Sequence, residues 1–274
     1  MKTITVVIFS LLFIVAALPS SAVMPLSISD ELLTDLQQFK SDPFLVNYVL
    51  TVLDSLPTYD RLFIKAAKIA AGLHIDIILQ EHSVLQPNQS GSLVPYVDGN
   101  IRHSQQKIKE LLLSRQYNVI GYEGIDIDPL DYEALVAFTQ RIARDTFGKR
   151  VSRQEAKEIL KLPSDDAVIE LIKAGQLKSP VIGLEAYELN LLEMKAMGLM
   201  DLPSTQLRYY ALENFCRHLG QLRAAIGVSK LIIKLDKLGK TKAAMVIGSA
   251  HQSELDLICR QLKLPHTFID TTKK

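Results

Sequence analysis

Apolar residues recur every three or four positions in the first part of the chain after residue 23. The recurrence is seen in ELLTDLQQF (31–39), over 44–56 and over 59–71. Such spacing is typical of amphipathic helices, and Ser29-Asp30 provides side chains of the kind that cap a helix N-terminus. The pattern predicts a helical segment over residues 23–72.

Short apolar runs then alternate with helix-like stretches and predict strands over 75–79, 118–122, 181–184, 243–247 and 267–269. Helices are predicted over 104–114, 150–161, 165–173, 187–197, 204–238 and 253–262. Residues 83–100 are rich in Pro, Gly, Ser and Asn, which predicts a loop. The alternation predicts an α/β fold, with a mostly parallel central sheet and helices on both faces. We expect one domain over 23–274, in which the helical segment 23–72 is a cap on a core over 74–270.

The first 22 residues have the three-part pattern of a secretory signal peptide. Lys2 precedes an uncharged, apolar stretch over 3–18, and Pro19 then leads into the small residues Ser-Ser-Ala at 20–22. The apolar stretch is shorter than the roughly 20 residues that a membrane-spanning helix needs. Segments of this kind are removed on export, so we expect cleavage before Val23 and a secreted or periplasmic protein.

The charge balance narrows the choice of partners. The chain has 31 Lys and Arg against 30 Asp and Glu, and removal of Lys2 with the signal peptide leaves a near-neutral chain. Nucleic-acid-binding proteins usually carry a strongly basic surface, so we expect no nucleic-acid partner. No later segment is apolar enough to span a bilayer, so we expect no membrane span after cleavage.

The chain has two cysteines, Cys216 and Cys259. An oxidising compartment permits a disulfide between them. Both lie on predicted helices, and Cys259 shares an apolar stripe with Leu255 and Ile258, which favours buried free thiols.

Four predicted strands end with ionisable residues. These endings are VIGYEG (119–124), VIGLEA (181–186), MVIGSAH (245–251) and IDIILQEH (75–82). Ligands of open parallel sheets bind at the carboxyl ends of the strands. We therefore expect Glu123, Glu185 and His251 to meet at one edge of the sheet, together with Glu81 and His82. The glycines in these endings allow close approach of backbone or substrate.

These endings resemble the Tiki/TraB/erythromycin-esterase/ChaN superfamily, in particular its secreted, uncharacterised bacterial members. The resemblance covers about residues 74–270, and its most specific piece is VIGSAHQSELDLICRQLKLPHTFI (246–269), which is similar to a C-terminal histidine motif. The other matching pieces are Glu81-His82, Gln105-Gln106, Glu123-Gly124, 183–185, and Arg208 with Glu213-Asn214. An insertion separates His82 from His103, and either residue could fill the role of the first histidine.

The resemblance implies a secreted, metal-dependent hydrolase with peptidase-like or esterase-like activity on a peptide or a small-molecule ester. Imidazole and carboxylate side chains suit Zn, Mn or Fe, and a bound metal would activate a water molecule. The implied ligands are His82 or His103, Glu81, Glu123 and His251.

Three other interpretations are open from the sequence. In a metal-free hydrolase, His251 with Glu123 or Glu185 would deprotonate a water molecule while Arg208 stabilises the developing negative charge. In a non-enzymatic protein, the same strand ends would bind haem or another small ligand. In a degenerate member of the superfamily, the site would be vestigial.

Overall fold

A central sheet of five strands organises the computed structural model, which describes residues 30–81, 84–87, 93–96, 99–162, 164, 166–200, 202 and 205–273. The strand order is β5-β4-β6-β1-β7, and every neighbouring pair is parallel. The bounds are β1 (His74–Gln80), β4 (Val119–Tyr122), β5 (Val181–Gly183), β6 (Lys242–Gly248) and β7 (His266–Asp270). The predicted α/β fold with a mostly parallel sheet is confirmed.

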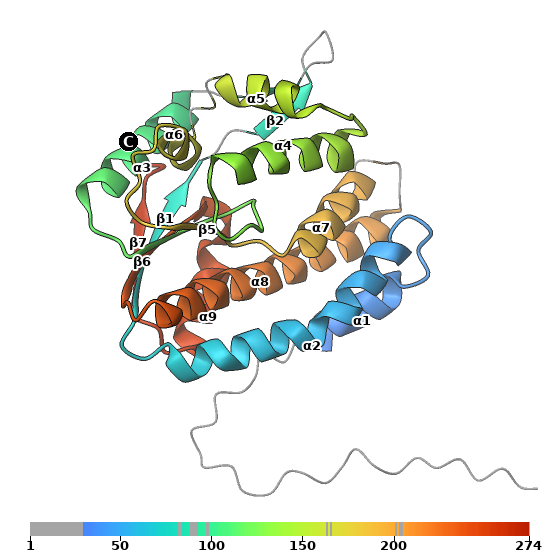
Figure 1. Ribbon diagram of the computed structural model, residues 1–274. Helices are drawn as coiled ribbons and strands as arrows, with labels where there is room; N and C mark the ends of the chain where they lie inside the picture. Colours follow the sequence, from blue (N-terminus) through green and yellow to red (C-terminus); the bar gives the residue numbers. More distant parts are fainter. Residues whose placement is uncertain are drawn as a thin grey trace, which may run out of the picture.

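Helices cover both faces of this sheet (Figure 1). One layer packs α2 (Val46–Ile69), α8 (Gln206–Lys237) and α9 (Gln252–Gln261) against one face. The other face is covered by α3 (Gly99–Ser114), α4 (Tyr132–Phe147) and α6 (Ala167–Lys173). The remaining helices are α1 (Asp30–Phe39), α5 (Arg153–Lys161), α7 (Tyr187–Met200) and the short 3₁₀ helix η1 (Ser249–His251).

Alternate residues of a strand belong to different layers. In β1, Ile75, Ile77 and Leu79 lie in the core with α2 and α8, whereas Ile78 lies in the core with α3 and α6. Successive side chains of a strand point to opposite faces, so a strand covered on both sides needs apolar residues throughout. This is why nearly continuous apolar runs, rather than alternating ones, predicted the strands, although Asp76 in β1 is a buried exception.

The N-terminal helices and the C-terminal half of the chain share a second apolar cluster. Side chains of α1 and α2 pack there against α7 and the first half of α8. The segments predicted over 44–56 and 59–71 form one helix, α2, with Pro57 inside it. A proline inside a helix costs about 3 kcal/mol, and burial of Val52, Leu56, Tyr59 and Phe63 on either side of Pro57 offsets that cost.

Residues 83–100 differ from the predicted loop. They contain two short antiparallel strands, β2 (Val84–Pro87) and β3 (Leu93–Tyr96), with Val84 opposite Tyr96. Helix α3 begins at Gly99, earlier than predicted. Pro, Gly, Asn and Ser are typical of loops, but two short stretches of this segment pair with each other, and composition alone does not reveal such pairing.

The predicted signal peptide, residues 1–22, lies outside the described residues. Among the residues that the structure describes, no helix is both long enough and apolar enough to cross a membrane.

Candidate functional site

The expected strand endings lie at adjacent positions along one edge of the sheet. Glu123 follows β4, Glu185 lies two residues after β5, and His251 ends the 3₁₀ turn after β6. Because β5, β4 and β6 are neighbours and parallel, their carboxyl ends meet. Glu81 follows β1, the next strand, and its Oε1 accepts a hydrogen bond from Ser249 Oγ at 3.2 Å.

Glu123 and His251 are in direct contact. Glu123 Oε1 lies 3.0 Å from His251 Nε2, and Glu123 Oε2 accepts a hydrogen bond from the backbone N–H of Gly248. Burial by itself would raise the pKa of Glu123, but His251, the Gly248 N–H and Arg223 together outweigh burial and lower it. Glu123 is therefore a carboxylate at neutral pH although its side chain is almost fully buried.

The same contact acts on the imidazole. Burial would lower the pKa of His251, and the Arg223 charge also acts in that direction, but the hydrogen bond and charge of Glu123 dominate and raise it above its ordinary value. With Nε2 facing Glu123, the other ring nitrogen, Nδ1, has no hydrogen-bond partner among the described residues.

Arg223, in the middle of α8, is the cation of this site. Its Nε and Nη2 donate to the two carboxylate oxygens of Glu185 at 2.8 and 2.6 Å. Its Nη1 donates to Glu193 on α7, and its Nη2 lies 3.8 Å from Glu123 Oε1. Burial would lower the pKa of Arg223, but Glu185, Glu193 and Glu123 raise it, so the guanidinium stays charged.

The structure does not place Arg208 beside Glu123 and His251, where the sequence predicted it. Arg208 lies in the first turn of α8, where its Nη2 pairs with Asp42 at 3.1 Å and its side chain is exposed. Arg223 is 15 residues further along the same helix, about 22 Å at the usual rise per residue. The sequence of a long helix does not reveal which of its turns lies at the edge of the sheet. The sequence did carry a signal: Arg223 is a lone charge between Leu222 and Ala224-Ala225.

A shallow hollow, open to solvent, lies beside the Glu123–His251 pair. Its polar lining consists of Glu123, Glu185, Arg223 and His251. Its apolar lining consists of Leu184, Ala224, Gly227, Met245 and Ile247. The ionisable pair thus lies beside an open hollow that is lined by both polar and apolar side chains.

The glycines in the strand endings serve close packing of the chain itself. A Cβ on Gly183 would lie 2.2 Å from the carbonyl oxygen of Ile125, because residues 125–127 cross the end of β5 and Gly183 N–H donates to Ile127 O at 2.7 Å. A Cβ on Gly121 would lie 2.6 Å from the side chain of Leu184. Close approach of backbone, one of the two expected uses, is thus seen.

Of the other expected ligand residues, Glu81 reaches the turn that carries His251 through Ser249. His82 lies outside the described residues. His103 is on α3, where its Nε2 is buried without a hydrogen-bond partner. Gln105 is buried and links Gln80 to the backbone N–H of Ala167, which is a structural role.

The donor set argues against a metal centre built from the described residues alone. Over those ranges, no group of three or more His, Cys, Asp or Glu side chains is arranged to hold a metal ion. Glu123 and His251 offer two ligands, but Glu185 is bound on both oxygens by Arg223, and a guanidinium 3.8 Å from Glu123 would repel a dication. The metal-free arrangement fits these residues better.

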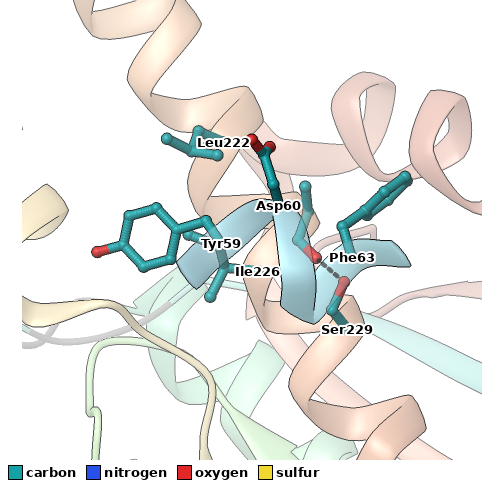
Figure 2. A pocket seen from close by; sticks show the side chains of 7 residues that line it. Tyr59, Asp60, Phe63, Leu222, Ile226 and Ser229 are labelled. Carbon is teal, nitrogen blue, oxygen red and sulfur yellow. Dashed lines mark hydrogen bonds between the residues drawn. The ribbon is translucent and has the colours of Figure 1, made fainter. Parts of the chain in front are cut away.

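A second small hollow lies between α2 and α8 (Figure 2). In Figure 2 the hydroxyl of Tyr59 points away from Asp60, and it donates to Glu188. The Ser229 hydroxyl donates to the carbonyl oxygen of Ala225 at 2.7 Å. The hydroxyls of Tyr59 and Ser229 are thus paired within the protein, and we assign this hollow no chemistry.

Both cysteines are free thiols in the structure. Cys259 lies in the core around α8 and α9, whereas Cys216 packs against the separate cluster formed with α1 and α2. Burial raises the pKa of each thiol to about 12, so neither is a reactive thiolate at neutral pH.

Comparisons with known proteins found no match to this chain. The chain matches no protein-family model, and no curated protein or solved structure is significantly similar to it.

Proposed function

We propose that this chain is a hydrolase of small-molecule esters or peptides in which His251, oriented by Glu123, carries out acid–base catalysis. The observation that supports the proposal is the 3.0 Å contact between Glu123 Oε1 and His251 Nε2 at the wall of a solvent-open hollow. A carboxylate behind an imidazole fixes its tautomer and orientation. The resemblance to the Tiki/TraB/erythromycin-esterase/ChaN superfamily also favours hydrolysis.

The chemistry follows from which ring nitrogen faces Glu123. If the Nε2–H group donates a hydrogen bond to Glu123, then Nδ1 is unprotonated and has a free lone pair. Nδ1 would take a proton from a water molecule as the water oxygen bonds to the substrate carbonyl carbon. When the bond from that carbon to the leaving oxygen or nitrogen breaks, the imidazolium would return the proton to the leaving group. Glu123 would stabilise the imidazolium in between.

Arg223 is poorly placed for the oxyanion role that the sequence assigned to an arginine. Three of its nitrogens already donate to Glu185 and Glu193. A developing oxyanion would need other donors, such as backbone N–H groups. The guanidinium instead holds the carboxylates of the site in place.

The proposal is tested by assaying the mature protein against nitrophenyl esters of increasing acyl length and against a quenched fluorescent peptide library. His251→Gln and Glu123→Gln should abolish turnover while leaving the circular dichroism spectrum unchanged. The matched control is His74→Gln, which alters an imidazole at the opposite edge of the sheet. Equal activity in His251→Gln and the parent protein would overturn the proposal.

The same assay tests dependence on a metal. Turnover that survives chelation by EDTA supports the metal-free scheme. Turnover that is lost and then restored by Zn, Mn or Fe would mean that residues such as His82 complete a metal site with Glu123 and His251. An absorption scan of the purified protein tests the haem-binding alternative, which predicts a Soret band and no turnover.

We also propose that the protein is exported, on the basis of the signal-peptide pattern over 1–22. Intact-mass measurement of protein from the native host should then give a chain that begins near Val23. A mature chain that retains Met1 would contradict export.

A further inference from the structure

We propose that the outer side of strand β7 is a dimerisation surface, at which β7 of a second copy of this chain pairs antiparallel with it. The sheets of the two copies would then form one continuous sheet. This inference concerns an interaction surface and does not depend on the chemistry proposed for Glu123 and His251.

The two outermost strands of the sheet, β5 and β7, differ in what covers them. Residues 125–130 run along the outer side of β5, where the Gly183 N–H donates to Ile127 O at 2.7 Å and the Leu130 N–H donates to Val181 O at 2.9 Å. All three residues of β5 are buried, whereas none of the five residues of β7 is buried. The chain thus covers one outer strand with its own backbone and leaves the other exposed.

The backbone of β7 has hydrogen-bonding groups that point away from β1. The carbonyl oxygen of Pro265 and the N–H of Thr271 both bond to β1, at 3.1 and 3.2 Å. Backbone groups alternate in direction along a strand, so the N–H and C=O groups of His266, Phe268 and Asp270 point outward. Among the residues that the structure describes, these outward groups have no hydrogen-bond partner. They provide the backbone donors and acceptors that another strand needs.

Strand β7 lacks the features that usually keep an exposed strand from pairing. Proteins protect such strands with Pro, with Lys or with a bulge. The strand reads HTFID, without Pro or Lys, and its register with β1 is regular over all five residues. Phe268 packs on the core from this strand and remains partly exposed. The outer side of β7 is therefore suited to pair with a further strand.

A second copy of the chain fits this surface because the outward groups are symmetric about Phe268. A two-fold axis beside Phe268 places this residue opposite its own counterpart, and places His266 opposite Asp270 of the other copy. Residues that face each other in this way exchange two hydrogen bonds, so every outward N–H and C=O group finds a partner. The two phenylalanine rings lie side by side on one face of the joined sheet, which adds an aromatic contact.

The charges at the two ends of the strand also suit this arrangement. Asp270 lies 3.0 Å from the largely exposed Lys273, and His266 lies 3.3 Å from Asp256 on α9. Antiparallel pairing brings the carboxylate and ammonium of one end to the imidazole and carboxylate of the other, and sets no two like charges directly opposite each other in the strands. An unrelated extended peptide could use the same N–H groups, but it would not require this symmetry.

The experiment is sedimentation velocity of the mature protein over a wide range of concentration. A pairing of five residues from each copy is smaller than a typical stable interface, so the mass should rise from one chain to two as the concentration increases. Phe268→Pro removes an outward N–H without removing a bond to β1, and should weaken the dimer by about tenfold or more. The matched control, Phe268→Ala, keeps that N–H and should weaken the dimer less. A parent protein that stays monomeric, or a Phe268→Pro variant that dimerises as well as Phe268→Ala, would overturn the proposal.

A second pair of variants covers the case in which Phe268→Pro fails to fold. Phe268→Lys and Phe268→Glu keep every backbone group, but each sets two like charges opposite each other at the two-fold axis. Each variant alone should therefore be monomeric, whereas an equal mixture of the two should recover the dimer because Lys then faces Glu. Circular dichroism checks that both variants are folded. A mixture no more dimeric than either variant alone would overturn antiparallel pairing about Phe268.

Discussion

The two edges of the central sheet each hold a buried carboxylate 3.0 Å from an imidazole, yet only one has the properties of a site. At the carboxyl edge Glu123 contacts His251, and at the amino edge Asp76 contacts His74. Asp76 also accepts from Tyr117 at 2.9 Å and from Arg115 at 3.2 Å, and Lys242 lies 3.8 Å away.

The two pairs differ in which charge is in excess. Asp76 is one carboxylate surrounded by cationic and hydroxyl donors, whereas three carboxylates surround Arg223 at the other edge. Donors that fully bind a carboxylate stabilise the fold and leave nothing for a ligand. Glu123 instead contacts an imidazole that lines a solvent-open hollow. A His–carboxylate pair alone therefore does not mark a candidate site. The access of solvent to the pair and the balance of charges around it distinguish the two edges.

The largest expected difference between the edges is in turnover. His251→Gln should lower kcat/KM by about 100-fold or more, the usual contribution of a general base, while His74→Gln should leave it within about twofold. Steady-state kinetics on the best ester or peptide measures both. Comparable losses in the two variants would erase the distinction between the edges.

Stability should show the reverse order. Asp76→Ala leaves the buried Tyr117 hydroxyl without its acceptor and should lower the free energy of unfolding by about 1–3 kcal/mol. Glu123→Gln keeps its shape and most of its contacts and should cost less. Urea unfolding followed by circular dichroism compares the two, and a larger loss in Glu123→Gln would reverse our assignment.

The pH dependence of stability separates the amino edge further. Tyr117, His74, Lys242 and Arg115 outweigh burial and lower the pKa of Asp76 in the folded state. The stabilisation is therefore fully present above the ordinary pKa of an aspartate and is lost as the pH falls through the folded-state value. In Asp76→Asn this acid-dependent part of the unfolding free energy should be missing, which thermal melts between about pH 2 and 6 can show.

The pH dependence of activity tests the role of His251 at the carboxyl edge. A neutral imidazole is the proposed base, so kcat/KM should rise as the pH passes through the pKa of His251. Because Glu123 raises that pKa, the midpoint of the rise should lie above the ordinary pKa of a histidine. A pH–rate profile measures it, and a midpoint below the ordinary range would contradict the contact.

The smallest expected effect concerns Gly248. A Cβ at this position would lie 3.2 Å from Glu123 Oε2, so Gly248→Ala should displace the carboxylate by a few tenths of an ångström. We expect a loss of kcat/KM of about tenfold or less with little change in stability. Gly198→Ala on α7 is the matched control, because a Cβ there meets no atom within 4 Å. Equal kinetics in the two variants would mean that the Glu123 position is not critical.

The strand endings show how much of the site could be predicted. The sequence predicts Glu123, Glu185 and His251 at one edge of the sheet. Apolar runs indicate buried parallel strands, and the carboxyl ends of parallel strands lie at the same edge. Arg223 and Glu193 were missed, although Arg223 is a lone charge in an apolar helical stretch. The hairpin of β2 and β3 was missed for a related reason, since strand pairing depends on a partner segment.

The sequence by itself determined the alternation of strands and helices, the parallel sheet, and the edge at which Glu123 and His251 lie. These features follow from local patterns: the spacing of apolar residues and the residue at which each run ends. Only the tertiary structure decided that Arg223 rather than Arg208 reaches that edge, and that Glu185 is bound to it. The physical reason is that several turns of a 32-residue helix present side chains on the same face. The packing of α8 on the sheet decides which of these turns contacts the site.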